Sequence, residues 1–429
     1  MGLNRDLKLE KNDFSNAATA FFIAYLVAEF PNGYILNKVP AGKWLGVNVV
    51  LWGISAACTA AAHNYQSLVA ARVFLGIFES AIAPSLMLIS SQWYTKSEQA
   101  PRFSFWYCGL GIGQIVGGII SYGFQQIHHP QFPAWRIMFI VLGVVTVVVG
   151  VATIFLVPDS PIQARFLSDT EKTGLLLHIA PNQTGVHNRH FKLSHVAEAV
   201  RDVQLWLLTL ITILISISSG VITTYSATLI RNIGYSPQQA ALLNMPSGLV
   251  SIFATVTVGF GVRHAPNGQR WLWIVICCIP GILGGALMSF LPSSARHTNK
   301  AGLLVGIYLV NFVVATLIVI YQWTAANIAG HTKRVVSMAL ISGSFSVGNI
   351  IGPQTFRARD APQYVPAKIA VLATQVAGAV VAVLLYRYYR WANARKEQSC
   401  AVQGQQTSLE KSQWGNLTDR ENVWFRYVY

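Results

Sequence analysis

The sequence predicts an all-α integral membrane protein built from two helical bundles. Of its 429 residues, 53% are hydrophobic and only 11% are charged, whereas soluble domains contain about 25% charged residues. Apolar stretches recur along the chain, and a bilayer is crossed by a helix of about 20 such residues. One long polar stretch, residues 158–205, separates five of these candidate spans from six others.

We expect eleven membrane-spanning helices, because each apolar stretch is long enough to cross a bilayer with some tilt. Residues 137–157 (IMFIVLGVVTVVVGVATIFLV), for example, are too long an apolar run for a strand of ordinary length. The expected spans cover approximately residues 16–37, 44–62, 67–91, 103–124, 136–157, 206–228, 240–262, 271–291, 302–326, 335–356 and 367–387.

The distribution of Lys and Arg predicts the orientation. The loops after the odd-numbered spans, together with the chain after Tyr386, hold 20 of the 31 Lys and Arg residues. Under the positive-inside rule these segments are cytoplasmic, which leaves the N-terminus outside. We therefore divide the chain into an N-terminal bundle (1–157), a cytoplasmic central loop (158–205), a C-terminal bundle (206–390) and a cytoplasmic tail (391–429). The tail is rich in Gln and Ser, so we expect it to be disordered.

Two charges inside one span predict a functional site. Arg72 and Glu79 lie in the apolar stretch 67–91, where a charge near the bilayer centre costs roughly 2.5–3.5 kcal/mol. Their spacing of seven residues places both on one helix face, about 10 Å apart along the axis. Arg72 can bind a carboxylate with two parallel hydrogen bonds. Burial favours the protonated form of Glu79, which makes it a candidate proton acceptor. The alternatives are snorkelling of Arg72 to the surface and a structural partner for Glu79.

Other polar or small residues within the spans are weaker candidates. Glu29, near the cytoplasmic end of the first span, is expected to support packing or an inner gate. The stretch GLGIGQIVGG contains Gly113 and Gly117, for which we expect close helix packing or a gating role. Polar residues in the C-terminal bundle are candidates for binding substrate by hydrogen bonds: Tyr225, Asn244, Asn311, Gln322 and Asn349. Lys333 and Arg334 are expected to be loop residues at the membrane surface.

Composition argues against several other classes of protein. The formal net charge of +15 does not predict nucleic-acid binding, because the basic residues are scattered through short loops. The five cysteines show neither a disulfide framework nor zinc spacing. The chain contains no phosphate-binding G-x-x-x-x-G-K-[ST] loop and no nucleophile–base spacing, so we expect no cofactor, no metal and no enzyme activity.

Several stretches, in order, resemble fungal anion:cation symporters of the major facilitator superfamily, and the later ones resemble the allantoate permease group in particular. They are residues 21–38 (FFIAYLVAEFPNGYILNK), 50–85, 134–143 (AWRIMFIVLG), 156–172, 218–248 and 327–364. The resemblance implies twelve spans for the family and aligns the first span here with the family's second. We expect a truncated gene model or an alternative start to account for the missing first span.

The resemblance also implies a function. It predicts a proton-coupled transporter of a small organic anion, such as allantoate or nicotinate, that works by alternating access as a monomer in the plasma membrane. It places Arg72 at the family's substrate-binding arginine and Glu79 at its proton-coupling glutamate. Two alternatives stay open. GLGIGQIVGG is similar to a motif of proton-antiport exporters, and a chain without its first span could be a transport-inactive sensor or interaction protein.

Overall fold

A computed structural model describes residues 3–10, 12–36, 38–126, 133–179, 192–265, 269–291, 299–356, 360, 363–403 and 417–429. Within these ranges every regular element is a helix, and eleven helical stretches are long and apolar enough to cross a membrane. They coincide with the eleven predicted spans, apart from small shifts at their ends and a longer last helix. The predicted fold class is confirmed.

The helices before and after the central loop are treated below as an N-terminal and a C-terminal half. The N-terminal half follows the short α1 (Leu3–Asp6) and consists of α2 (Asp13–Leu36), α3 (Ala41–Cys58), α4 (Tyr65–Glu79), α5 (Ile82–Trp93), α6 (Lys96–Gln125) and α7 (Ala134–Leu156). The C-terminal half consists of α10 (Val203–Asn232), α11 (Pro237–Leu243), α12 (Met245–His264), α13 (Arg270–Phe290), α14 (Lys300–Val310), α15 (Val313–Asn327), α16 (His331–Gln354) and α17 (Val365–Gln403).

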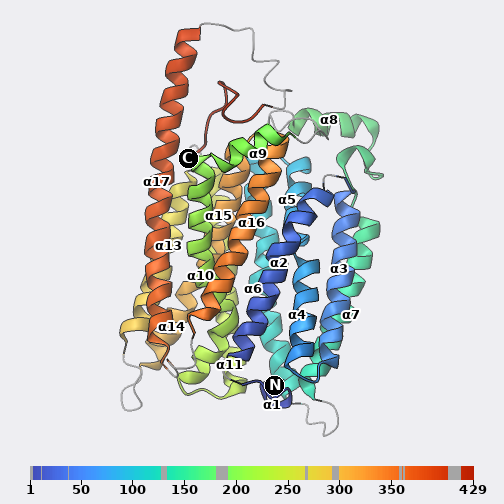
Figure 1. Ribbon diagram of the computed structural model, residues 1–429, viewed down its shortest axis with the longest axis vertical. Helices are drawn as coiled ribbons and strands as arrows, with labels where there is room; N and C mark the ends of the chain where they lie inside the picture. The colour runs from blue at the N-terminus through green and yellow to red at the C-terminus, as the bar shows by residue number, and fades with distance from the viewer. Residues whose placement is uncertain are drawn as a thin grey trace.

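The central loop contains two helices, α8 (Asp169–Ile179) and α9 (Leu193–Val200), at one end of the molecule. We call this the inner end, because the Lys and Arg residues predict it to be cytoplasmic, and the opposite end, where α1 lies, the outer end (Figure 1). A capping box starts α8. The Ser168 backbone N–H donates to Glu171 Oε2 at 2.8 Å, and the Glu171 N–H donates to Ser168 Oγ.

Glycines bring α3 and α7 into backbone contact. Gly46 and Gly53 on α3 face Gly150 and Gly143 on α7, and each pair of glycines is seven residues apart. A Cβ added to Gly53 would lie 2.7 Å from the Val147 backbone nitrogen. Small residues on one helix face allow such close approach inside a bilayer. α3 and α7 thus pack on each other, whereas α2 and α6 contact helices of the C-terminal half.

Three spans are interrupted, and the first interruption positions Glu79. α4 ends at Glu79, and α5 begins at Ile82. Pro84 explains this break, since a proline has no N–H to bond the carbonyl four residues earlier and its ring clashes with it. That carbonyl belongs to Ser80. The other breaks lie between α11 and α12 and between α14 and α15. Glu79 is thus at a helix end in the middle of its span.

The halves meet where α2 packs on α16 and α6 packs on α12. At the second contact, a Cβ on Gly111 would lie 2.6 Å from the Gly248 carbonyl oxygen, so the two backbones touch. The seam between the halves therefore combines a rigid contact at α6–α12 with a contact at α2–α16 that contains the polar groups described below.

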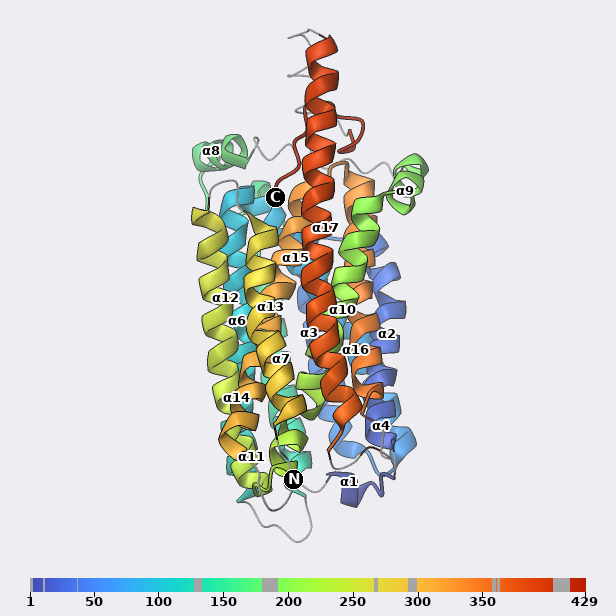
Figure 2. The same cartoon turned by 90° about the vertical axis from the view of Figure 1, so that its left-hand side faces the viewer.

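The tail differs from its prediction. Residues 391–403 continue α17 beyond the bundle (Figure 2), and residues 417–429 pack on the inner end of the C-terminal half. Tyr427 is only 5% exposed, and the Asn393 side chain bonds both its N–H and its carbonyl. Disorder was predicted from composition, which does not register these contacts. Residues 404–416 lie outside the described residues.

Candidate functional site

One face of α4 carries the two predicted charges. Arg72, Gly76 and Glu79 share that face, and Gly76 packs on α2, because a Cβ there would collide with the Phe21 carbonyl oxygen. A capping box at Asn64 and Ser67 fixes where α4 begins, with the Ser67 N–H donating to Asn64 Oδ1 at 2.8 Å. The local sequence thus aims both charges at α2 and not at lipid.

The two charges are close enough to interact electrostatically, yet no salt bridge joins them. Among the described residues, neither Arg72 nor Glu79 has an ion-pair partner or a side-chain hydrogen bond. Both residues are half-buried. A guanidinium in this situation keeps its donors for a ligand.

Three tyrosines extend the site from α4 to the other helices of the seam. Tyr25 lies on α2, where its backbone nitrogen faces Gly76 of α4, and Tyr107 lies on α6. The Tyr107 ring lies 6.2 Å from the ring of Tyr321 on α15, and their hydroxyl groups interact. All three side chains are at least nine-tenths buried. Buried phenol groups at a boundary between moving halves can pair with each other and with a polar solute.

Glu29 lies one helical turn from Tyr25 toward the inner end. It is 1% exposed, and its carboxylate faces Ser342 of α16. The nearest groups are Tyr25 on its own helix and Ser342 on α16. Glu29 lies in the α2–α16 contact, and its role in packing or at an inner gate stays a prediction.

Tyr225, predicted to bind substrate, lies instead near the outer end. Its hydroxyl shares a hydrogen bond with Ser15 of α2, and its ring stacks on Phe356 at 4.3 Å. Near it, Gln354 Nε2 donates to Thr19 Oγ1 at 2.8 Å, again between α16 and α2. These contacts close the outer end of the seam, so Tyr225 is placed to hold a gate.

The remaining polar candidates, Asn349, Asn244 and Gln322, lie in three different places in the C-terminal half. Asn349 Nδ2 donates to the Phe345 carbonyl, and its backbone packs on Gly220 of α10 inside the C-terminal half. Asn244 forms the junction of α11 and α12 toward the outer end. Gln322, by contrast, is buried on α15 next to Tyr321 and stays close to the seam.

In the glycine-rich stretch of α6, the glycines that pack closely on α12 are not Gly113 and Gly117, which the sequence analysis named. Gly113 and Gly117 are exposed, and an added Cβ would meet nothing within 4 Å. Gly111 and Gly118 make the close contacts with α12. Between them, Gln114 Nε2 approaches Asn311 Oδ1 at 3.4 Å and links α6 to the junction of α14 and α15.

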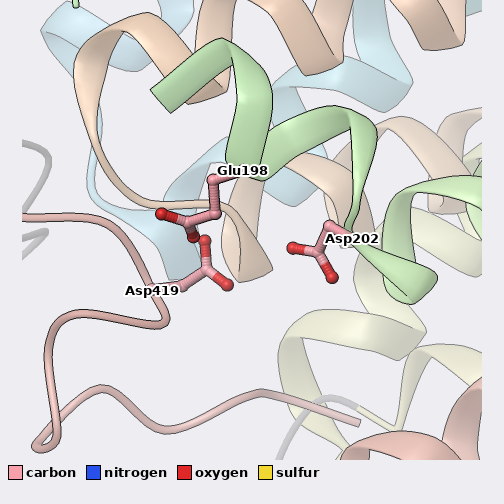
Figure 3. Close-up of side chains that lie close together, drawn as sticks. All are labelled: Glu198, Asp202 and Asp419. Atoms are coloured by element: carbon pink, nitrogen blue, oxygen red, sulfur yellow. The ribbon is translucent and has the colours of Figure 1, made fainter. Parts of the chain in front are cut away.

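A second charge cluster lies at the inner end of the C-terminal half. Lys333 is fully buried, and its Nζ contacts Glu198, Asp202 and Asp419 at 2.9, 2.7 and 2.7 Å. Figure 3 shows the three carboxylates converging from α9, the start of α10 and the tail. Their oxygens lie within 4.8 Å of one another, but the Lys333 ammonium takes the place that a metal ion would need. Lys333 was predicted to be a loop residue at the membrane surface, and this is wrong.

The tail completes this second cluster, which we call the inner cluster (Glu198, Asp202, Lys333, Asp419 and Arg420). Arg420 pairs with Asp202 at 3.0 Å, and Asp419 also accepts bonds from Gln204 and Tyr427. Burial raises the pKa of the Asp419 carboxyl, and Lys333 opposes that shift. Every charge in the cluster has an opposite charge beside it, which is typical of a structural role.

Sequence reasoning missed Tyr25, Tyr107 and Tyr321 as parts of the site. The sequence feature that could have identified them is a tyrosine in the middle of an apolar span, because its hydroxyl needs a buried hydrogen-bond partner there. The inner cluster had no local signal, because Lys333 and Asp419 are 86 residues apart in the chain.

The comparison with family models decides the identity of the chain. The model of the Major Facilitator Superfamily matches residues 1–353. The chain belongs to the major facilitator superfamily. Within this superfamily, the thiamine pathway transporter THI73 of Saccharomyces cerevisiae is 39% identical over 431 residues, which covers 100% of this chain and 80% of that protein. The allantoate permease of the same yeast is 30% identical over 440 residues, with 100% and 80% covered.

The fold agrees with this assignment. The proton:xylose symporter XylE bound to 6-bromo-6-deoxy-D-glucose has a TM-score of 0.71 to this chain, with 90% of each chain covered and 16% sequence identity. That likeness concerns the fold alone. Together the comparisons make the protein a multi-pass membrane transporter of small molecules and not an enzyme, as the sequence predicted.

Proposed function

We propose that this major facilitator protein is a proton-coupled transporter of a small organic anion, with Arg72 binding the anion and Glu79 carrying the proton. The observation that carries the proposal is the absence of a salt bridge to either charge on the α2-facing side of α4, within the residues that the structure describes. An unpaired cation in the membrane interior is costly. A carboxylate substrate would offset that cost, and protonation would offset the cost of Glu79.

The substrate class follows from the chemistry of the site. A guanidinium fork prefers a carboxylate or another planar anion. The names of two relatives supply the first compounds to test, allantoate and compounds of the thiamine pathway. Of these, an organic carboxylate such as allantoate fits Arg72 directly.

The transport cycle would use the two ends of the seam in turn. In this structure the outer end is held by Ser15–Tyr225 and Thr19–Gln354, and the inner side is packed at Glu29 and Ser342. Alternating access requires the halves to separate at one end while they stay in contact at the other. Substrate bound at Arg72 lies between these two sets of contacts and would be exposed to each side in turn.

Uptake into proteoliposomes containing the purified protein tests the proposal. Labelled allantoate, nicotinate and thiamine are supplied outside, with and without an inward proton gradient. We expect gradient-stimulated uptake of a carboxylate, loss of that uptake in Arg72→Gln, and loss of the gradient's effect in Glu79→Gln. Uptake of thiamine alone, or full activity of Arg72→Gln, would contradict the proposal. Efflux driven by an opposed proton gradient, without uptake, would identify an exporter instead.

A further inference from the structure

Two of the interrupted spans have their breaks next to each other in the C-terminal half. The break between α11 and α12 lies at Asn244, and the break between α14 and α15 lies at Asn311 and Phe312. The Tyr308 hydroxyl on α14 donates to the Leu243 carbonyl on α11 at 2.8 Å, so the two breaks are neighbours. Interrupted helices in a bilayer leave polar groups that regular helices would satisfy, and in transporters such breaks often form solute sites.

Gln114 on α6 reaches both breaks from the N-terminal half. Its Nε2 lies 3.4 Å from Asn311 Oδ1, at the break between α14 and α15. It also packs on α12, because a Cβ added to Gly248 would lie 3.2 Å from the Gln114 Cβ. Asn244 is four residues before Gly248 and therefore lies on the same face, toward α6.

Ser247 adds a hydroxyl group beside α14. In a regular helix its N–H would bond the Leu243 carbonyl. Here the Ser247 N–H bonds the Asn244 carbonyl at 3.2 Å, and the Leu243 carbonyl accepts the Tyr308 hydroxyl instead. Asn311 follows Tyr308 by three residues, about one turn farther along α14. We call these four side chains the polar cluster: Gln114, Asn244, Ser247 and Asn311.

Three side chains of the polar cluster have a buried polar atom without a hydrogen bond. Gln114 Oε1, Asn244 Oδ1 and Ser247 Oγ have no partner among the described residues. Ser247 and Asn311 themselves are completely buried. A buried polar atom without a partner costs free energy, so nearly all such atoms in folded proteins bond protein, water or ligand. Three of them at one place indicate a site for a molecule that binds and leaves.

We propose that the polar cluster is a second recognition point for the transported anion, and that it binds a neutral group with both a donor and an acceptor, such as an amide. This inference rests on the proposed transport of a carboxylate bound by Arg72. The cluster consists of amide and hydroxyl groups, which donate and accept hydrogen bonds but carry no charge. Gln114 belongs to the N-terminal half and the other three side chains to the C-terminal half, so the bound group contacts both halves.

The polar cluster lies at a depth similar to that of the α4 charges. α4 and α14 both begin at the outer end (Figure 1). Glu79 comes fourteen residues after the first residue of α4, and Asn311 eleven after the first residue of α14, or about 21 and 16 Å along the two helices. A solute that crosses between the halves therefore meets both sites at one stage of its passage.

Two carboxylates of equal charge and nearly equal shape test this preference. Succinamate carries an amide where 4-methylpentanoate carries an isopropyl group. The amide satisfies polar atoms of the cluster, whereas the isopropyl group leaves them without a partner. The Kd of each anion is obtained from the dependence of the unfolding temperature of the detergent-solubilised full chain on anion concentration. We expect the wild type to bind succinamate at least about tenfold more tightly than 4-methylpentanoate.

The variants Gln114→Met and Asn311→Leu remove polar groups of the cluster and keep the size of the side chain. We expect each to reduce the difference between the two anions to less than about threefold, with little change in the unfolding temperature without anion. Gln125→Met and Asn48→Leu are the matched controls. Gln125 bonds within α6, and Asn48 bonds the carbonyl four residues earlier, as Asn311 does. A large fall in stability with an unchanged anion preference would show that the cluster is structural.

The variant Arg72→Gln separates this inference from the proposed function. If the wild type binds both anions equally and Arg72→Gln weakens both, the carboxylate site stands and the polar cluster binds water alone, which overturns the inference. If Arg72→Gln binds both anions as tightly as the wild type does, the proposed role of Arg72 fails. Loss of the amide preference in Gln114→Met would still support the cluster in that case. A wild type that binds neither anion would overturn both proposals.

Discussion

Two charge clusters in the described part of the chain differ in how many of their charges have an oppositely charged partner. In the inner cluster, Lys333 touches three carboxylates and Arg420 pairs with one of them. On α4, Arg72 and Glu79 interact without a salt bridge. Removing charges from water costs free energy in both clusters. Only in the inner cluster do ion pairs within the protein offset that cost.

The difference separates structure from transport. A charge whose every partner is supplied by the chain fixes the position of its neighbours, and the inner cluster holds α9, α10, α16 and the tail together. A charge left without a partner is available to something that comes and goes. The contrast supports the proposal that the inner cluster serves stability and the α4 cluster serves substrate and proton, and the two roles predict opposite behaviour on mutation.

The largest expected effect is on stability, from the inner cluster. Lys333→Met leaves the buried Asp202 and Asp419 and the partly buried Glu198 with Arg420 as the only cation of the cluster. Loss of one partner of a buried ion pair costs about 3–5 kcal/mol. We expect a large fall in the unfolding temperature of the detergent-solubilised protein. The control Lys43→Met removes an exposed pair with Asp159, which is worth about 0–1 kcal/mol. Equal unfolding temperatures for the two variants would break the comparison.

The next effect is on transport, from the α4 cluster. Arg72→Gln removes an unpaired charge from the membrane interior, so we expect stability to stay level or to rise. Substrate uptake should fall by about a hundredfold or more, which corresponds to a loss of roughly 2.8 kcal/mol of binding. Arg263→Gln, at an exposed position on α12, is the control. Reduced stability together with normal uptake would mean that Arg72 is structural.

A smaller effect is expected at the outer gate. Tyr225→Phe removes the hydroxyl that bonds Ser15 but keeps the ring that stacks on Phe356. Loss of a hydrogen bond worth about 0.5–1.5 kcal/mol shifts the halves toward the outward-open state. The KM for external substrate should then fall by roughly two- to tenfold. The exposed Tyr122→Phe should leave KM unchanged, and an unchanged KM in Tyr225→Phe would remove this residue from the gate.

The smallest effect is the pH dependence of tail docking. Burial raises the pKa of Asp419 above its ordinary value of 3.8, so the docked tail binds this proton more tightly than the released tail does. Docking is then strongest below the ordinary pKa and weakens as the pH rises through the raised one. The mobility of a spin label at Arg426→Cys should increase with pH, and Asp419→Asn should abolish the dependence. Greater mobility in acid would show that the pairing with Lys333 dominates.

The sequence predicted the spans and the α4 site for physical reasons that are local. A membrane-crossing segment must satisfy its own backbone, so length and apolar content identify a helix. Arg72 and Glu79 were found because both lie within one span, where helical periodicity fixes their common face.

What the sequence could not predict depends on contacts between distant segments. The partners of Lys333 come from positions 86 to 135 residues away, and Tyr225 meets Ser15 across 210 residues. A lysine at the end of a span has the same local sequence whether it faces water or three carboxylates. The six glycines of α6 pose the same problem, since only the position of α12 makes Gly111 and Gly118 the contact residues.

The most direct test of the account removes both α4 charges at once. The double variant Arg72→Gln/Glu79→Gln is compared with the wild type for carboxylate flux in proteoliposomes and for unfolding temperature in detergent. If the two side chains bind substrate and proton, carboxylate flux disappears in the double variant while its unfolding temperature stays the same or rises. Undiminished flux, or a protein that no longer folds, would show that these two side chains serve the fold and not the transport.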